Sequence, residues 1–203
     1  MGLEINHSFL ICAFPRSRTM WLAQFLSVPG VSTCTHEATE FSGNAAEFWH
    51  NAECSCRASG VQIYGNSDSA NTFVLPALLA ERPLTRVVWI ARPIAEVAKS
   101  MKAAKMPFTE QSARTLIALR DAHWAHFDLM IDFKDLERMD TCRELWEFCL
   151  PMVPFDAGRW GLFHSCKIGY SAAQPPPEKP YAKFLAWVRK ELNCSVEGNI
   201  KDR

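Results

Sequence analysis

The sequence predicts an α/β protein, a three-layer sandwich in which helices cover both faces of a central parallel sheet. Two observations carry this prediction. Short apolar runs alternate along the chain with longer segments of helical periodicity. The clearest runs, SFLICAF (8–14) and RVVWIA (86–91), are continuously apolar after their first residue, which is typical of strands that are buried on both faces.

The expected elements follow from these patterns and from Pro, Gly and capping residues. Pro29-Gly30 ends the first helix, Asn71 or Thr72 caps a later one, and Pro93 suits the first turn of the next. We expect strands at 8–14, 31–35, 61–64, 86–91 and 128–133. We expect helices at about 19–27, 45–50, 73–81, 93–104, 110–126, 141–150, 156–163 and 181–192. The remaining predictions are a loop up to residue 58, a polar turn GNSDSAN at 65–71, and an extended proline-rich spacer at 172–180.

Length and composition limit the classes of protein. The 203 residues (1–203) are expected to form one domain. Lysine plus arginine equal aspartate plus glutamate at 22 each, so we expect no nucleic-acid partner, because such proteins usually carry a basic excess. We expect neither a membrane partner nor a signal peptide, because the chain has no apolar run of roughly 20 residues and no basic leader.

The eight cysteines are scattered, which indicates free thiols and a cytoplasmic location. His50, Cys54 and Cys56 lie close in sequence, but no second ligand pair follows at finger-like spacing. We therefore predict no metal site.

Two strand ends carry the candidate chemistry. Arg16-Ser17-Arg18-Thr19 follows the first strand and opens a helix, where backbone N–H groups and the helix dipole favour an anion. Arg92 follows the strand 86–91, and Ser100 lies about two turns into the next helix. Both corners lie at the carboxyl edge of a parallel sheet, where ligands bind. The alternative is a pair of solvated surface turns.

The two corners together resemble motifs of the sulfotransferase family. FPRSRTMWL resembles the 5′-phosphosulfate loop, and RVVWIARPIAEVAKSM resembles the 3′-phosphate motif, in which a serine follows the strand-end arginine by eight residues. MIDFKDLE (130–137) resembles a later strand of the family. The loop departs from the family pattern, because Arg18 and Met20 stand where glycine and a second threonine are usual. Arg18 adds a charge and removes the backbone freedom of glycine.

The resemblance implies a P-loop nucleoside-triphosphate-hydrolase-like fold and the donor 3′-phosphoadenosine 5′-phosphosulfate (PAPS), with PAP as product. Arg16 would neutralise charge on the leaving phosphate, and Ser17, Arg18, Thr19 and Met20 would form the 5′-phosphate loop. Arg92 and Ser100 would bind the 3′-phosphate; alternatively they are a helix-start arginine and a buried hydroxyl. Trp21 matches a tryptophan that packs on adenine in some members, or it faces the core.

An acceptor hydroxyl or amine needs a base. In carbohydrate-type sulfotransferases a glutamate follows the second strand, where this chain has THEATEF (35–41). Glu37 is the first candidate and His36 the second; alternatively Glu37 only opens the next helix.

The sequence thus predicts a PAPS-dependent sulfotransferase acting on a small-molecule or carbohydrate acceptor. Two alternatives stay open: a small nucleotide or sugar kinase with a degenerate phosphate loop, and a non-catalytic nucleotide-binding module of the same fold.

Overall fold

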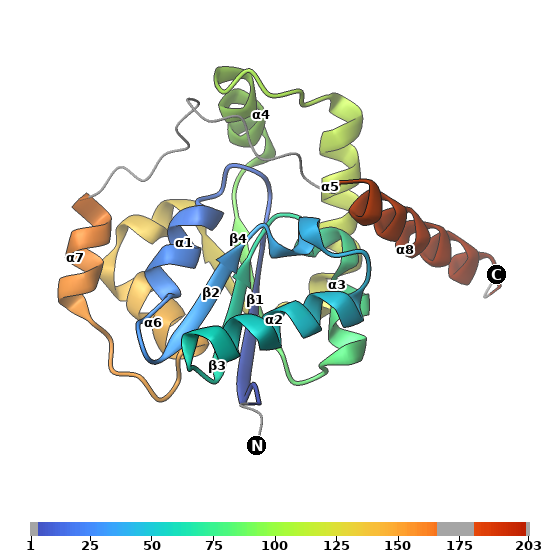
Figure 1. The fold of residues 1–203 in the computed structure, drawn as a ribbon. Helices are drawn as coiled ribbons and strands as arrows, with labels where there is room; N and C mark the ends of the chain where they lie inside the picture. Colours follow the sequence, from blue (N-terminus) through green and yellow to red (C-terminus); the bar gives the residue numbers. More distant parts are fainter. Residues whose placement is uncertain (1–3, 166–180, 202–203) are drawn as a thin grey trace.

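The computed structural model describes residues 4–165 and 181–201, and within them the chain forms a five-stranded, all-parallel sheet flanked by helices (Figure 1). The sheet has the strand order β2-β3-β1-β4-β5. The strands are β1 (His7–Ala13), β2 (Ser32–His36), β3 (Ile63–Ser67), β4 (Arg86–Ala91) and β5 (Leu129–Asp132). The predicted α/β class with a parallel sheet is therefore confirmed.

Helices follow the strands in alternation. The α-helices are α1 (Thr19–Leu26), α2 (Ala45–Ser59), α3 (Asn71–Glu81), α4 (Ile94–Ala103), α5 (Glu110–Ala122), α6 (Met139–Cys149), α7 (Ala157–Ser165) and α8 (Tyr181–Lys201). Three short 3₁₀ helices in the described ranges are η1 (Ala38–Phe41), η2 (Trp124–His126) and η3 (Phe133–Glu137).

The apolar side chains of the strands form part of two hydrophobic clusters, one on each face of the sheet. In β1, Phe9 and Ile11 belong to the cluster beneath α1 and α6, whereas Leu10 and Cys12 belong to the cluster beneath α2 and α3. Side chains alternate between the two faces of a strand, so a strand that is covered on both sides must be apolar at every position. This explains why the run SFLICAF has no polar residue after Ser8.

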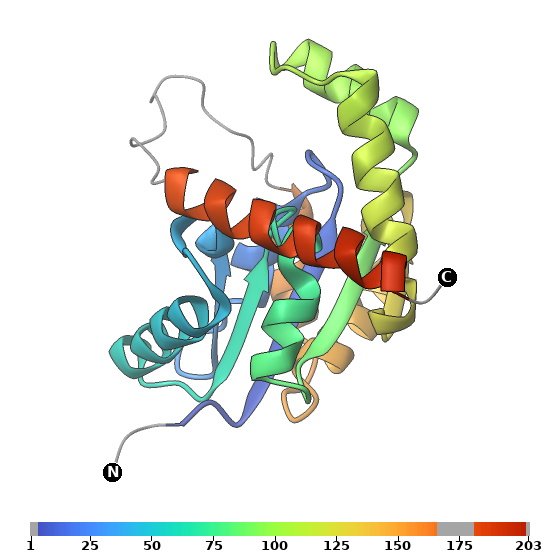
Figure 2. The same ribbon diagram turned by 90° about the vertical axis from the view of Figure 1, so that its right-hand side faces the viewer.

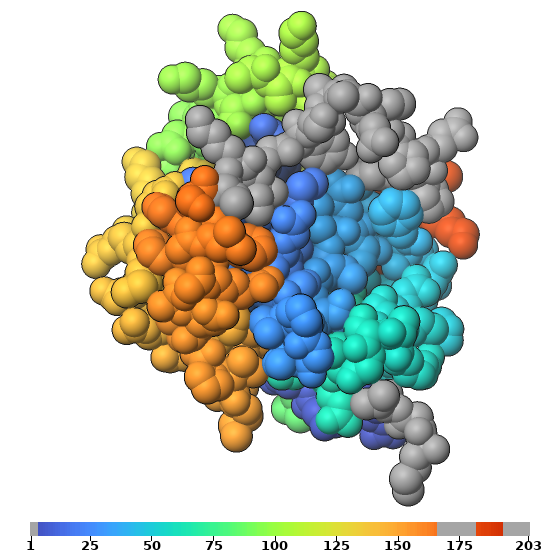
Figure 3. Space-filling model, turned by 60° about the vertical axis from the view of Figure 1, so that its left-hand side comes forward, coloured from blue at the N-terminus to red at the C-terminus, as the bar shows by residue number. Residues whose placement is uncertain are grey.

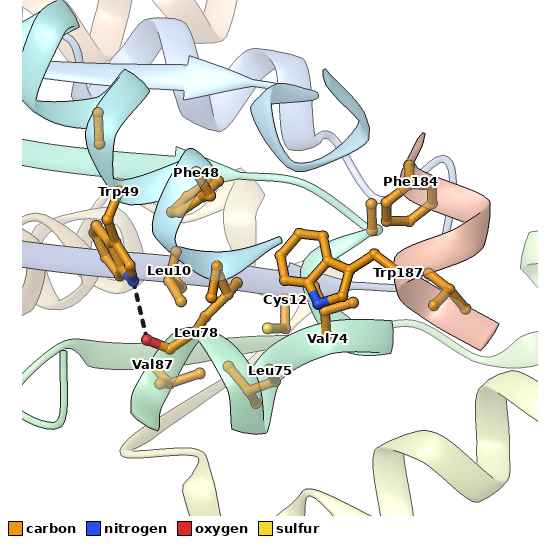
Figure 4. Close-up of a cluster of buried hydrophobic side chains, with 14 of the residues drawn as sticks. Leu10, Cys12, Phe48, Trp49, Val74, Leu75, Leu78, Val87, Phe184 and Trp187 are labelled. Atoms are coloured by element: carbon orange, nitrogen blue, oxygen red, sulfur yellow. Dashed lines mark hydrogen bonds between the residues drawn. The ribbon is translucent and has the colours of Figure 1, made fainter. Parts of the chain in front are cut away.

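The face covered by α2, α3, α5 and α8 is drawn in close-up in Figure 4. Trp49 of α2 donates a hydrogen bond from Nε1 to the carbonyl of Leu78 at 3.0 Å, so its indole N–H is satisfied although the ring is buried. Phe184 and Trp187 of α8 join the same cluster. In Figure 2, α8 crosses this side of the molecule, where it packs on α3 and η1.

The third strand differs from the prediction. It runs on through Gly65, Asn66 and Ser67, which were expected to be a turn. Gly65 is required here because a Cβ at this position would lie 2.1 Å from the Phe9 ring. Asn66 is buried because its amide is satisfied by hydrogen bonds to the Thr39 hydroxyl (2.9 Å) and Asn71 Oδ1 (2.8 Å). Tertiary packing thus overrides the turn propensity of these residues.

The second helix is also longer than expected, since α2 continues to Ser59, where a loop was predicted. The last helix, α8, likewise continues to Lys201, beyond its predicted end at residue 192. The other strands and helices within the described residues begin and end within a few residues of the predicted positions. The predicted spacer at 172–180 lies outside the described residues.

The strand order creates a switch point between β1 and β4. The connection that leaves β1 leads through α1 to β2 on one side of the sheet, and the connection that leaves β4 leads to β5 on the other. Ligands of open α/β sheets bind in the crevice where such connections diverge, beyond the carboxyl ends of the strands. The Arg16 and Arg92 corners both lie there. The α4–α5 hairpin rises beside this edge (Figure 2).

Candidate functional site

The loop between β1 and α1 holds an uncommon backbone conformation. Arg16 (φ 66°) and Arg18 (φ 62°) are both left-handed. Among the residues that the structure describes, only two other non-glycine residues have positive φ, Glu37 (61°) and Lys105 (55°). Glu37 lies at the same edge of the sheet as the loop. Each costs about 1–2 kcal/mol for an L-residue, and such strain is typical of functional sites. Arg18 therefore adopts a left-handed conformation that a glycine would accept without this cost.

The start of α1 has donors that no capping group satisfies. No side chain of the described residues caps the helix, and its first turn has no acidic residue. The side chain of Ser17 is fully buried, and its hydroxyl has no hydrogen-bond partner within the described ranges. Buried polar groups are normally paired. A buried serine hydroxyl beside uncapped N–H groups fits an anion.

The two predicted corners meet. Arg92, which follows β4, donates a hydrogen bond from Nη1 to the carbonyl of Arg16. Arg16 Nε lies 3.5 Å from the hydroxyl of Ser100 on α4. Because β1 and β4 are hydrogen-bonded neighbours, the residues after them share one crevice. One ligand can therefore contact both corners.

The surroundings of Arg92 are crowded with charge. Burial lowers the pKa of its guanidinium, and the charges of Arg16 and Arg18 lower it further, while Glu96 opposes them. Glu96 Oε2 lies 3.8 Å from Arg92 Nε, and the Phe133 ring centroid lies 4.1 Å from the guanidinium carbon. Arg92 is thus held in place by an aromatic ring and a carboxylate.

Arg18 is engaged by η3. Its guanidinium pairs with Glu137, and its guanidinium carbon lies 5.4 Å from the centroid of Phe133. Glu137 is also 3.5 Å from His164 Nδ1 on α7. The side chain of Arg18 therefore links the loop to the segment after β5, and its backbone N–H stays at the start of α1.

The candidate bases lie at the end of β2. Nδ1 of His36 donates to the carbonyl of Ser67 at 2.8 Å, since a carbonyl oxygen can only accept, and Nε2 lies 3.5 Å from Glu37 Oε1. Their side chains are 20% and 24% exposed, so both reach the surface of the edge. Because β3 separates β2 from β1, this pair lies roughly 10 Å across the sheet from the Arg16 loop.

A buried polar network supports this end of the sheet, and the sequence patterns did not predict it. The Thr39 hydroxyl donates to Asn71 Oδ1 at 2.5 Å, and Asn71 Nδ2 donates to the carbonyl of Ile11 at 3.1 Å. Asn66 bridges the two, as described above. The network ties the η1 loop, which follows Glu37, to α3 and β1. Its signal in the sequence is the Asn-rich stretch GNSDSAN, which was interpreted as a turn.

Trp21, in the first turn of α1, faces the core. Trp21 is 6% exposed, and its ring stacks on that of Phe25 with centroids 4.9 Å apart. Its Nε1 donates a hydrogen bond to the carbonyl of Phe163 at 3.0 Å. This position agrees with the core interpretation of Trp21 and not with adenine packing. Met20, the next residue towards the loop, is half-buried.

Arg159, on α7, lies away from the anion loop. It donates to the carbonyls of Gln24 (2.5 Å), Phe25 (2.8 Å) and Ser27 (2.6 Å), at the C-terminal end of α1. Figure 3 shows α7, which carries Arg159, lying against α1. Arg159 therefore satisfies helix-end carbonyls at the opposite end of α1 from the anion loop.

The cysteines of α2 differ in environment, since Cys54 is exposed and Cys56 is buried. In the described part of the chain, no three His, Cys, Asp or Glu side chains are grouped to hold a metal ion. No helix there is long and apolar enough to cross a membrane.

A cavity of about 610 Å³ lies at the amino edge of the sheet, between α2 and the turn before β4. We place the candidate site at the carboxyl edge and not at this cavity, because the switch point, the strained loop and the converging arginines all lie at the carboxyl edge.

Comparison with known proteins assigns no family: no family model, curated protein or solved structure matches the chain.

Proposed function

We propose that the protein is a sulfotransferase that transfers a sulfuryl group from PAPS to a hydroxyl or amine of a small-molecule or carbohydrate acceptor. The observation that carries this proposal is the meeting of two cationic corners at the switch point, with Arg16 Nε 3.5 Å from Ser100 Oγ. PAPS has two separate anionic groups on one adenosine and therefore needs two neighbouring anion sites. We also propose, with the family resemblance, that the sheet is of the P-loop-like class and that the protein acts in the cytoplasm.

The donor would be held as follows. The backbone N–H groups of Ser17, Arg18 and Thr19, at the uncapped start of α1, together with the buried Ser17 hydroxyl, suit the 5′-phosphosulfate. Arg92 and Ser100 suit the 3′-phosphate. When bound, PAPS supplies the sulfuryl group, which leaves the 5′-phosphate for the acceptor atom.

The side chains of this chain would assist that transfer from two sides. Arg16, which is exposed at the edge, would neutralise charge that develops on the leaving phosphate. Glu37, with His36 as the second candidate, would take the proton from the acceptor. The roughly 10 Å between the β2 and β1 ends leaves room for the acceptor and the sulfuryl group between base and loop.

Binding of adenosine 3′,5′-bisphosphate tests the donor site. We expect wild-type protein to bind it more tightly than AMP, and Arg92→Ala to abolish the difference, because only the 3′-phosphate contacts Arg92. Absence of binding by the wild type, or equal preference in Arg92→Ala, would contradict the proposal. Tighter binding of ATP with Mg²⁺ than of the bisphosphate would favour the kinase.

A non-catalytic nucleotide-binding module is the second candidate. Arg18 already pairs with Glu137, and Arg92 already donates to the loop carbonyl, so both cations have partners within the protein. A mass-shift screen of acceptors with PAPS distinguishes the two: the enzyme gives a sulfated product that Glu37→Gln strongly reduces, whereas the module binds donor without turnover.

A further inference from the structure

Three guanidinium groups gather at the anion corner, and they repel one another. Arg16, Arg18 and Arg92 come from two neighbouring strand ends, and Arg92 is the most buried, with a side chain that is 13% exposed. Something in the protein must hold these cations in place when no anion is bound. The contacts of η3 identify what does so.

The pairing of β4 with β5 places Phe133 beside Arg92. Ala91 lies opposite Asp132 in this parallel pair. Arg92 and Phe133, which directly follow these two strands, therefore lie side by side at the carboxyl edge. The sheet register thus fixes this neighbourhood, and no loop has to fold back to create it.

The ring of Phe133 contacts two guanidinium groups. Its centroid lies 4.1 Å from the guanidinium carbon of Arg92 and 5.4 Å from that of Arg18. The face of an aromatic ring carries negative electrostatic potential, and its attraction for a cation grows as water is excluded. The contact with the more buried Arg92 is therefore the stronger of the two.

Carboxylates complete the arrangement. Glu137, at the end of the same 3₁₀ helix, pairs with Arg18. Lys134, next to Phe133, lies 3.3 Å from Glu96 Oε1, and the other oxygen of Glu96 faces Arg92. Through Phe133, Lys134 and Glu137, η3 therefore contacts both corners of the site.

We propose that Phe133 is a positioning residue of the donor site: its ring orients the guanidinium of Arg92 towards the 3′-phosphate and keeps that of Arg18 beside the loop. This inference rests on the proposed function for the identity of the ligand, whereas the orientation itself is a property of the free protein.

The test compares Phe133→Leu, which keeps an apolar side chain but removes the π face, with Phe133→Tyr, which restores it. We expect Phe133→Leu to weaken adenosine 3′,5′-bisphosphate binding by about fivefold to thirtyfold, and AMP binding by less than about twofold. Phe133→Tyr should bind like wild type. Isothermal titration calorimetry measures all three proteins.

Phe148→Leu is the matched control. It removes another ring–guanidinium contact, with Arg86 at 5.0 Å, at the amino edge of the sheet. We expect it to leave both nucleotide affinities unchanged. An equal loss of affinity for both nucleotides in Phe133→Leu would show a merely structural role and overturn the proposal, as would an unchanged affinity for the bisphosphate.

A second measurement separates this inference from the proposed function. In ligand-free protein, the NMR signal of the Arg92 Nε–H group, assigned with Arg92→Ala, should carry a ring-current shift that Phe133→Leu removes and Phe133→Tyr retains. If wild-type protein binds neither nucleotide, the proposed function fails, and this signal alone decides the inference. An Arg92 signal that is identical in Phe133→Leu and wild type would overturn it.

Discussion

Replacing Arg18 separates the strain of the anion loop from the contacts of its side chain. Arg18→Ala removes the Glu137 ion pair, between groups that are 34% and 52% exposed, and the ring contact with Phe133. We expect about 0.2–1 kcal/mol from the exposed pair and about 0.5–1 kcal/mol from the ring. Arg18→Ala should therefore lower the free energy of unfolding by about 1–2 kcal/mol.

Arg18→Gly loses the same contacts but relieves the left-handed backbone at φ 62°. That relief is worth about 1–2 kcal/mol, and the greater freedom of glycine in the unfolded chain offsets about 0.5–1 kcal/mol of it. We therefore expect Arg18→Gly to be more stable than Arg18→Ala by about 0.5–1 kcal/mol, although glycine is the smaller residue.

Urea denaturation of both variants measures this difference. Lys105 is a matched control, because it also has positive φ (55°) and lies in the exposed turn after α4, away from the loop. Lys105→Gly should likewise be more stable than Lys105→Ala, without any effect on nucleotide binding. If Arg18→Ala were as stable as Arg18→Gly, the loop would not be strained, and this argument for a functional site would fail.

Three further predictions concern the scaffold of the site. Asn71→Ala leaves buried partners of the Thr39–Asn66 network unsatisfied and should lower the free energy of unfolding by about 2–4 kcal/mol, measured by urea denaturation. Arg159→Ala frees three carbonyls at the end of α1 and should cost about 1–3 kcal/mol while leaving affinity for the bisphosphate unchanged; a large loss of affinity would instead place Arg159 at the ligand. Burial, together with the neighbouring His126, lowers the pKa of His123 below its ordinary 6.5. The unfolded chain therefore takes up this proton first, so the contribution to stability is complete above about pH 7 and is lost as the pH falls through 6.5 towards the folded pKa. His123→Gln should flatten the dependence of unfolding free energy on pH in that range, and an unchanged slope would show that His123 titrates normally.

Local patterns were enough to predict most of the fold. The uninterrupted apolar runs at 9–14 and 87–91 indicated two central strands, because such sequences are typical of strands that are covered on both faces. Composition misled the prediction at β3, where Gly65, Asn66 and Ser67 have the residue types of a turn. Their place in the sheet depends on the Phe9 ring and on hydrogen bonds to Thr39 and Asn71, which come from other elements.

The sequence likewise predicted one part of the candidate site and missed another. The positions of Arg16 and Arg92 directly after apolar runs predicted that both lie at strand ends, and the sheet brings them within contact. Trp21 shows the limit of such reasoning, since a motif position cannot say which way a helix turns its side chains, and the ring packs in the core.

The sequence by itself determined the alternation of strands and helices and the arginines that follow two of the strands, because periodicity and strand ends are local properties of the chain. Only the tertiary structure decided that these arginines meet, that Arg18 pairs with Glu137, and that Phe133 lies beside Arg92. These contacts depend on strand order and register, which arise when segments far apart in the chain pack into one sheet.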